Sequence, residues 1–375
     1  MLGQQFFSVK KYSEYIHEHF IPVYARIEDE FGETIQDKYH INSNPSLLIT
    51  KPDGSLYDIL TSYREDPEKY LERVRKSVNG INTYASIKEQ FDRSPNDLRK
   101  VYALADKHFQ MWQPREGVEL CQKIVDRLNE AKSMEVLFEG KNINLYEVAR
   151  YGTGFGEWLN RRSPDGLEAF RSEFPTSMLS HQAYSELANI YLNLPISDKG
   201  ESFYGDLKHK YPDDPSLLNM LVRYYTKSGK HLDEGEKYAR KLVGLRPKSR
   251  GYRQNAADLF LKNDNADRAL KIYGKAYIQD HMEVPNELNS YAWFWALRSS
   301  NLESALETIQ KAFKLDPKDD NLLDTMSMVY WKMKEYKKAI ETEERALRMN
   351  PDNQGYRERI EEIRKDMAKN GITQL

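Results

Sequence analysis

Hydrophobic residues in the second half of the chain recur with a helical period and fall into pairs of helices. The stretch AYSELANIYLNL carries Tyr184, Leu187, Ala188 and Tyr191 at offsets of three, four and seven, which places these side chains on one helix face. A second helical stretch, FYGDLKHK, follows and ends before Pro212. Similar pairs continue toward the C-terminus, so the pattern predicts an array of helical hairpins over residues 181–353.

Pairs of alanines mark the second helix in three consecutive units of this array. The two alanines of each pair stand seven residues apart, in the pairs Ala269 and Ala276, Ala305 and Ala312, and Ala339 and Ala346. Seven residues make about two helical turns, so we expect both alanines of a pair on one face. Their small side chains would let neighbouring helices approach closely.

Period, residue types and helix order together resemble the tetratricopeptide repeat over residues 181–353. Gly200 and Gly235 stand where that repeat has alanine. The resemblance implies an α-solenoid that binds a protein or peptide partner on the surface of its first helices. The charged residues 354–375 then form a capping helix and tail. The outward positions implied by the resemblance are the peptide-binding candidates Ser185, Asn189, Gln254, Asp258, Asp324 and Met328.

Residues 81–180 repeat the hairpin pattern less clearly. LRKVYALADKHFQMW followed by GVELCQKIVDRLNEA predicts one helical hairpin, and LYEVARYGTGFGEWLN followed by LEAFRSEFP predicts another. We interpret both as divergent repeats. The segment 132–143 between them is predicted to be a connecting loop.

The first eighty residues change period. The spacing predicts a helix over 9–19, a strand over 20–27, a short helix over 31–41 and a strand over 46–51. Pro52-Asp53-Gly54-Ser55 then predicts a turn into a returning strand. Asp66-Pro67 has the residue types that open a helix, with aspartate as N-cap.

This order, together with Tyr39-His40-Ile41 and Pro45-Ser46-Leu47-Leu48-Ile49, resembles the thioredoxin-like fold. The resemblance makes Pro45 the cis-proline of that family and places Tyr63 just after the hairpin. The family's first strand and its C-x-x-C motif would precede Met1, so we expect an incomplete domain at residues 1–80. A truncated reading of a longer gene explains this better than a degenerate domain. The predicted fold class is therefore mainly α, an α-solenoid preceded by a small, incomplete α/β domain.

Composition and charge argue against several classes of function. The chain has 56 basic and 58 acidic residues without a long run of either sign, which argues against a nucleic-acid partner. No apolar stretch approaches the length of a membrane span. Cys121 is the single cysteine, so neither a disulfide within the chain nor a dithiol site can form. It lies in an apolar helical pattern and is interpreted as a buried core residue.

The remaining candidate motifs favour structural interpretations. Gly152-Thr153-Gly154-Phe155-Gly156 lacks the spacing of a dinucleotide-binding loop and is interpreted as a site of close helix packing or of a helix break. His17 and His19 lie two residues apart, on different sides of a helix, so they would not share a metal. Trp293, Trp295 and Trp331 are either ligand anchors or, as we favour, core residues.

These observations predict a non-catalytic bacterial scaffold for protein–protein interaction, with no cofactor, no metal and no enzymatic activity. The alternative is the C-terminal portion of a thiol-disulfide oxidoreductase whose C-x-x-C lies upstream of Met1. The sequence as read predicts a cytoplasmic protein, and a truncated N-terminus would instead predict the periplasm or cell envelope.

Overall fold

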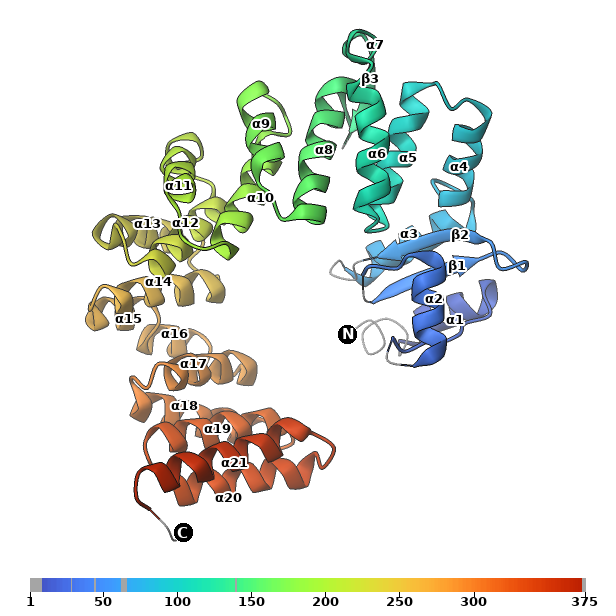
Figure 1. The fold of residues 1–375 in the computed structure, drawn as a ribbon. Helices are drawn as coiled ribbons and strands as arrows, with labels where there is room; N and C mark the ends of the chain where they lie inside the picture. Colours follow the sequence, from blue (N-terminus) through green and yellow to red (C-terminus); the bar gives the residue numbers. More distant parts are fainter. Residues whose placement is uncertain (1–8, 28, 44, 62–65, 139, 373–375) are drawn as a thin grey trace. The chain divides into compact units, whose positions relative to one another are not determined.

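The computed structural model describes residues 9–27, 29–43, 45–61, 66–138 and 140–372. The chain divides into two compact units, Met1–Leu194 and Pro195–Leu375. Helices dominate both units (Figure 1).

The first unit begins with a β-hairpin and three helices. They are α1 (Lys10–His19), α2 (Glu30–Tyr39), β1 (Ser46–Thr50), β2 (Leu56–Thr61) and α3 (Pro67–Val78). The strands β1 and β2 pair antiparallel, joined by the predicted turn, in which Gly54 has a φ of 78°. The Asp66 side chain accepts a hydrogen bond from the Glu68 backbone N–H, so the predicted helix start is confirmed. Tyr12, Leu60 and Tyr70 bring α1, β2 and α3 into one apolar cluster.

The predicted strand over 20–27 is wrong. In the described part of this segment the backbone forms no strand, and Ile21 and Tyr24 are 94% and 84% exposed. A strand needs a hydrogen-bonded neighbour, and among the described residues β1 pairs only with β2. The apolar residue types were therefore not sufficient to form a strand.

Two details of the thioredoxin-like resemblance fall beside or on segments that the structure does not describe. Pro45 lies immediately before β1 and is exposed, while its preceding residue, Asn44, is outside the described residues. Tyr63 also lies outside them. The described residues 30–78 keep the predicted order of helix, hairpin and helix, without the additional strand that would extend the sheet.

The rest of the first unit is a series of packed helices. They are α4 (Tyr84–Arg93), α5 (Leu98–Gln110), α6 (Pro114–Val125), α7 (Leu128–Lys132), α8 (Leu145–Arg161), α9 (Asp165–Glu173) and α10 (Ser180–Asn193). The two predicted hairpins of 81–180 are confirmed as α5 with α6 and α8 with α9.

The predicted loop over 132–143 is wrong, because it contains an antiparallel hairpin of β3 (Glu135–Phe138) and β4 (Lys141–Asn144). Its side chains alternate: Val136 and Phe138 pack against the helical core, whereas Leu137 is exposed. This period-two alternation is short and is flanked by polar residues, so the sequence pattern did not predict a strand.

Of the two interpretations of the glycines of 152–156, close helix packing is confirmed and a helix break is wrong, since all three are buried within the continuous helix α8. A Cβ atom at Gly152 would lie 2.8 Å from the Cys121 sulfur of α6. At Gly154 it would lie 2.7 Å from the backbone of Gly166 in α9. Glycine at these positions therefore lets α8 contact both neighbouring helices.

Replacing Gly154 with alanine should lower the free energy of unfolding of the first unit by about 1–3 kcal/mol, because backbone rather than a flexible side chain faces the added methyl group. Chemical denaturation monitored by circular dichroism would measure the loss. Gly205→Ala is the matched control, since Gly205 is also helical and a Cβ atom there meets nothing within 4 Å. The control should be neutral or stabilising by up to about 1 kcal/mol. Equal effects of the two substitutions would contradict the packing argument.

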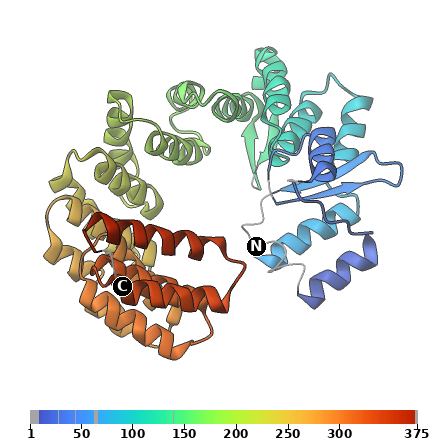
Figure 2. The same cartoon turned by 60° about the horizontal axis from the view of Figure 1, so that its bottom comes forward.

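The second unit is a succession of helical hairpins, which Figures 1 and 2 show side by side. Its helices are α11 (Asp198–Lys210), α12 (Pro215–Ser228), α13 (Leu232–Leu245), α14 (Arg250–Lys262), α15 (Ala266–Ile272), α16 (Lys275–Asp280), α17 (Pro285–Leu297), α18 (Leu302–Leu315), α19 (Asp320–Lys332), α20 (Tyr336–Met349) and α21 (Gln354–Lys369). The expected burial of both alanines is confirmed in α18 and in α20.

The third alanine pair departs from expectation. Ala269 is buried in α15, but Ala276 is exposed in α16, so the two do not share a helix face. The helix breaks at Gly274, where a Cβ atom would lie 2.0 Å from the Leu270 carbonyl oxygen. The carbonyl groups freed by the break are bound by neighbouring helices: Trp295 Nε1 donates to the Tyr273 oxygen at 3.1 Å, and Arg253 donates to the Ile272 oxygen at 2.6 Å. Two helices thus replace the single helix that the sequence pattern predicted.

Candidate functional site

Asparagine recurs near the start of successive first helices in the second unit. Asn219 is the fifth residue of α12, Asn255 the sixth of α14 and Asn289 the fifth of α17. Asp324 takes the fifth position of α19. The sequence intervals are 36, 34 and 35 residues, and all four side chains are half-buried. We call these four residues, together with Trp293 one turn after Asn289, the first-helix face.

The amides on this face include one hydrogen-bonding group without a partner. Asn255 Nδ2 donates to Asn219 Oδ1 at 2.7 Å, which links α12 to α14. Asn289 Oδ1 is shielded from solvent and has no hydrogen-bond partner among the described residues. An unpaired, shielded acceptor costs about 1–3 kcal/mol, so this oxygen would gain from a donor supplied by a ligand.

Two of the predicted peptide-binding residues are engaged within the second unit. Asp258 forms a two-pronged ion pair with Arg298, in which Nη2 and Oδ2 are 2.5 Å apart. Gln254 Nε2 donates to the Tyr273 hydroxyl at 3.1 Å. Both side chains therefore join α14 to the following helices.

The other predicted residues are placed as follows. Ser185 and Asn189 belong to α10 in the first unit, where Ser185 Oγ donates to the His181 oxygen and Asn189 is exposed. Met328 is buried, contrary to its expected outward position. Helix α21 covers it, and the Arg359 Nη1 atom lies 3.6 Å from its sulfur. Asp324 remains half-buried on the first-helix face.

The three asparagines were not singled out by the sequence analysis. Their 34–36-residue recurrence was present in the sequence, but the register chosen for α14 selected Gln254, one residue before Asn255. The structure resolves this shift, because the hydrogen bond to Asn219 identifies the side chain that faces the preceding first helix.

A buried acid adjoins Asp324. Glu343 in α20 has 0% exposure, and neither carboxylate oxygen has a hydrogen-bond partner in the described part of the chain. It stands 34 residues after Ile309, so a carboxylate occupies a position that is apolar in the preceding unit. Burial raises the pKa of Glu343 to about 8, and the charge of Asp324 adds to the shift. Burial also raises the pKa of Asp324.

Arg359 of α21 is a cation whose charge acts to lower the pKa of both acids, against the effect of burial. Its guanidinium lies over the Trp293 ring, 5.6 Å from the ring centroid. Its Nε atom is 3.8 Å from a Glu362 carboxylate oxygen, so the negative charge of Glu362 offsets part of the positive charge of Arg359. Arg359 thus brings α21 against first helices α17 and α19.

The predicted capping helix is present as α21, and Asp366 anchors it. The Asp366 carboxylate accepts hydrogen bonds from Trp331 Nε1 at 2.8 Å, the Tyr336 hydroxyl at 3.0 Å and Lys334 Nζ at 3.1 Å. The Trp331 hydrogen bond is the largest of the effects that lower the pKa of Asp366 to about 2. Trp331 therefore holds the cap, while Trp295 is fully buried in the core.

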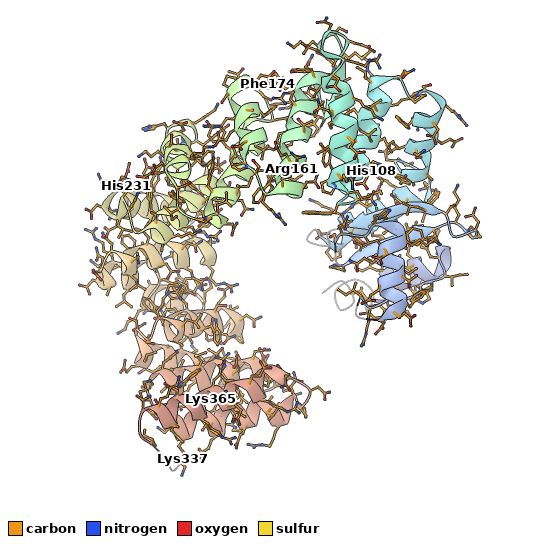
Figure 3. The ribbon with its side chains drawn as sticks, viewed as in Figure 1. His108, Arg161, Phe174, His231, Lys337 and Lys365 are labelled. Carbon is orange, nitrogen blue, oxygen red and sulfur yellow. The ribbon has the colours of Figure 1, made fainter. Side chains whose placement is uncertain are left out.

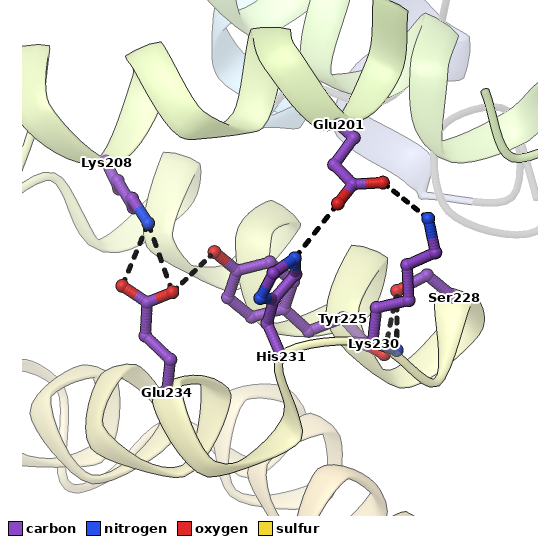
Figure 4. Close-up of polar contacts among 7 residues, drawn as sticks. All are labelled: Glu201, Lys208, Tyr225, Ser228, Lys230, His231 and Glu234. Carbon is purple, nitrogen blue, oxygen red and sulfur yellow. Dashed lines mark hydrogen bonds and ion pairs between the residues drawn. The ribbon is translucent and has the colours of Figure 1, made fainter. Parts of the chain in front are cut away.

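Polar contacts also join hairpins at the start of the second unit (Figure 4). Glu201 of α11 binds Lys230 at 2.6 Å and His231 at 2.9 Å, both in the loop before α13. Lys208 binds Glu234 at 2.8 Å, and this contact lowers the pKa of Glu234. These pairs link consecutive hairpins and account for His231 without a ligand.

A hollow of about 420 Å³ lies within the first unit and is lined by Tyr39, Tyr84, His108 and Glu116, among others. Figure 3 shows His108 near the β-hairpin. Burial lowers the pKa of His108, and its Nδ1 atom lies 2.8 Å from Gln113 Oε1. Within the described ranges, no three His, Cys, Asp or Glu side chains gather closely enough to bind a metal ion.

Cys121 does not provide reactive chemistry in this unit. It is fully buried, as predicted, and burial raises the pKa of its thiol well above the usual range. A thiol held in this form is a poor nucleophile.

Comparison with known proteins supports the repeat interpretation at one position. Residues 321–353, which include α19 and α20, match the family model of the tetratricopeptide repeat. This segment is a tetratricopeptide repeat. It also carries Asp324 and Glu343. None of the curated protein sequences compared with the chain matches it.

Several solved structures are similar at low sequence identity. A tetratricopeptide repeat protein from Parabacteroides merdae ATCC 43184 is 15% identical, with a TM-score of 0.45, covering 71% of this chain and 98% of that one. Yeast Tom70 is 14% identical, with a TM-score of 0.42 and coverages of 82% and 68%. YrrB, described as a tetratricopeptide repeat protein with an unusual peptide-binding site, is 14% identical, with a TM-score of 0.32 and coverages of 51% and 96%. The thioredoxin-like resemblance of residues 1–80 receives no support from these comparisons.

Among the helices in the described ranges, none combines the length and apolarity needed to cross a bilayer.

Proposed function

We propose that the chain is a non-catalytic scaffold that binds an extended peptide segment of a partner protein on the first-helix face. The observation that carries this proposal is the row of asparagines, in which Asn289 Oδ1 is shielded and unpaired. The tetratricopeptide repeat at 321–353 supports it, since repeats of this kind present their first helices to partners.

Asparagine suits the recognition of a peptide backbone. Its side-chain amide both donates and accepts hydrogen bonds, as each peptide unit of an extended chain does. The recurrence of Asn219, Asn255 and Asn289 on successive helices offers such groups at regular intervals. This arrangement favours a peptide held through its main chain with little demand on most side chains.

The test begins with a phage-displayed library of random twelve-residue peptides, panned against the whole chain. The affinity of a selected synthetic peptide is then measured by titration for the wild type and for Asn255→Ala/Asn289→Ala. Losing two hydrogen bonds, each worth about 0.5–1.5 kcal/mol, should weaken binding about ten-fold.

Asn321→Ala is the control, because Asn321 is an exposed asparagine on a first helix but lies outside the first-helix face. It should leave the affinity unchanged. The proposal fails if no peptide is selected, or if the double variant binds as tightly as the control.

A further inference from the structure

We infer that the bound peptide presents a basic side chain, arginine or lysine, to Asp324 and Glu343 at the α19 end of the first-helix face. The inference rests on the proposed function and adds the chemical class of the partner segment. It concerns a pair of carboxylates that the surrounding protein leaves incompletely neutralised.

Asp324 continues the row of asparagines with a charged group. It stands at the same helix position as Asn219 and Asn289, and its side chain is half-buried rather than covered. A ligand that follows the asparagines would therefore meet a carboxylate next. A carboxylate at this point favours a donor with a positive charge over a neutral backbone group.

Glu343 makes the need for a donor stronger. It is fully buried beside Asp324, and both of its oxygens lack hydrogen-bond partners within the described residues. The Ser327 hydroxyl, which lowers the pKa of Glu343, donates its hydrogen bond to the Ala339 carbonyl oxygen at 2.9 Å. Ionising this buried carboxyl group is costly, and an approaching cation would remove much of that cost.

The charges facing the pair leave a local excess of acid. Asp320 of α19 accepts hydrogen bonds from the Tyr356 hydroxyl and from Asn350. Both donors are neutral, so they add no positive charge near the pair. From α21, Arg359 is the facing cation, and Glu362 lies within 3.8 Å of it. Arg359 therefore offsets Glu362 as well as the pair, and a second cation remains favourable.

A cation already packs on an aromatic ring next to the acid pair. Trp293 already accepts the Arg359 guanidinium at 5.6 Å from its ring centroid, so this ring is placed to interact with cations. Met328 is covered by α21, and its sulfur lies 3.6 Å from Arg359 Nη1, so it supports Arg359 and does not face a ligand. An arginine or lysine from a peptide would place its charged end at the acid pair, next to Arg359 and Trp293.

Binding of such a cation should release a proton. Because the pKa of Glu343 is raised to about 8, its carboxyl group is mostly protonated at pH 7 in the free protein. A nearby positive charge favours the ionised form and lowers that pKa. Affinity for an arginine peptide should therefore rise as the pH increases from about 6 to 8, the range below the shifted pKa.

Panning the random twelve-residue library at pH 8 tests the inference. Peptides selected on the wild-type chain should be enriched in arginine or lysine at one position, and those selected on Asp324→Asn/Glu343→Gln should lose that enrichment. Selection of peptides without basic enrichment, or with acidic enrichment, would overturn the inference and leave the proposed function standing. Selection of no peptide at all would overturn both.

A titration with synthetic peptides gives the second readout. Replacing the arginine of a selected peptide with citrulline, which keeps the shape but removes the charge, should weaken binding to the wild type about ten-fold. The same replacement should have little effect on Asp324→Asn/Glu343→Gln. Glu341→Gln is the matched control, since Glu341 is exposed on the same helix and two residues away. Equal losses in the wild type and the double variant would contradict the inference.

Discussion

Replacing Lys107 with methionine should lower the free energy of unfolding of the first unit by about 3–5 kcal/mol, because it leaves a buried carboxylate without its counterion. Lys107 Nζ of α5 lies 2.6 Å from Asp58 Oδ1 of β2, and the two side chains are 5% and 1% exposed. Asp58 also accepts a hydrogen bond from Ser77 Oγ of α3 at 2.7 Å and one from the Tyr84 backbone N–H of α4 at 3.3 Å. One carboxylate therefore joins the hairpin to three helices.

Hydrogen exchange in β2 is the sharpest measurement of this loss. If the hairpin separates from α5, amide protection in residues 56–61 should fall by about two to four orders of magnitude. Lys11→Met is the matched control, since the Lys11–Glu68 pair at 2.5 Å is exposed and exposed ion pairs contribute little to stability. Similar losses in the two variants would show that burial is not what makes the Lys107 contact important.

Replacing Glu343 with glutamine should stabilise the second unit, with an effect that depends on pH. Burial and the charge of Asp324 raise the folded-state pKa to about 8 from an ordinary value of 4.5. The folded chain therefore holds its proton more tightly than the unfolded chain does. Below pH 4.5 both states are protonated and the wild type carries no penalty. Between pH 4.5 and 8 the unfolded state ionises first, so the wild type loses stability as the pH rises.

Glutamine cannot ionise, so the variant should escape this loss. The difference in unfolding free energy should be near zero at pH 4 and reach about 2–4 kcal/mol in favour of the variant at pH 8. Thermal denaturation at a series of pH values would measure it, with Glu341→Gln as the exposed control. A constant difference across this pH range, or a less stable variant at pH 8, would be inconsistent with an unpaired buried acid.

The two predictions distinguish a buried acid that stabilises the fold, Asp58, from a buried acid that destabilises it, Glu343. Asp58 has a cation and several hydrogen-bond donors, so removing its partner should be damaging. Glu343 lacks such partners among the described residues, so removing its charge should be beneficial. A buried acid that lowers the stability of the free protein is explained if a ligand supplies the missing positive charge. For this reason Glu343 is part of the proposed site for a basic peptide.

The sequence by itself determined the helical hairpins of the second unit and their approximate limits. Alanine pairs at a fixed spacing identify tightly packed helices because a small side chain is needed wherever two helix axes approach closely. Gly152, Gly154 and Gly156 were understood for the same reason. Such signals are local, since they depend on residue size and on the helical period alone.

Only the tertiary structure decided which residues face a ligand and which strands form. Residues 20–27 have the apolar types of a strand, but a strand also requires a neighbour elsewhere in the fold, which the described residues do not provide. Ala276 is exposed because Gly274 breaks its helix. A one-residue shift at α14 separated Gln254 from Asn255, and the contact with Asn219 across two helices was needed to resolve it. Likewise, Met328 was expected to face outward, but α21 covers it, because a register deduced within one helix contains no information about what packs over that helix.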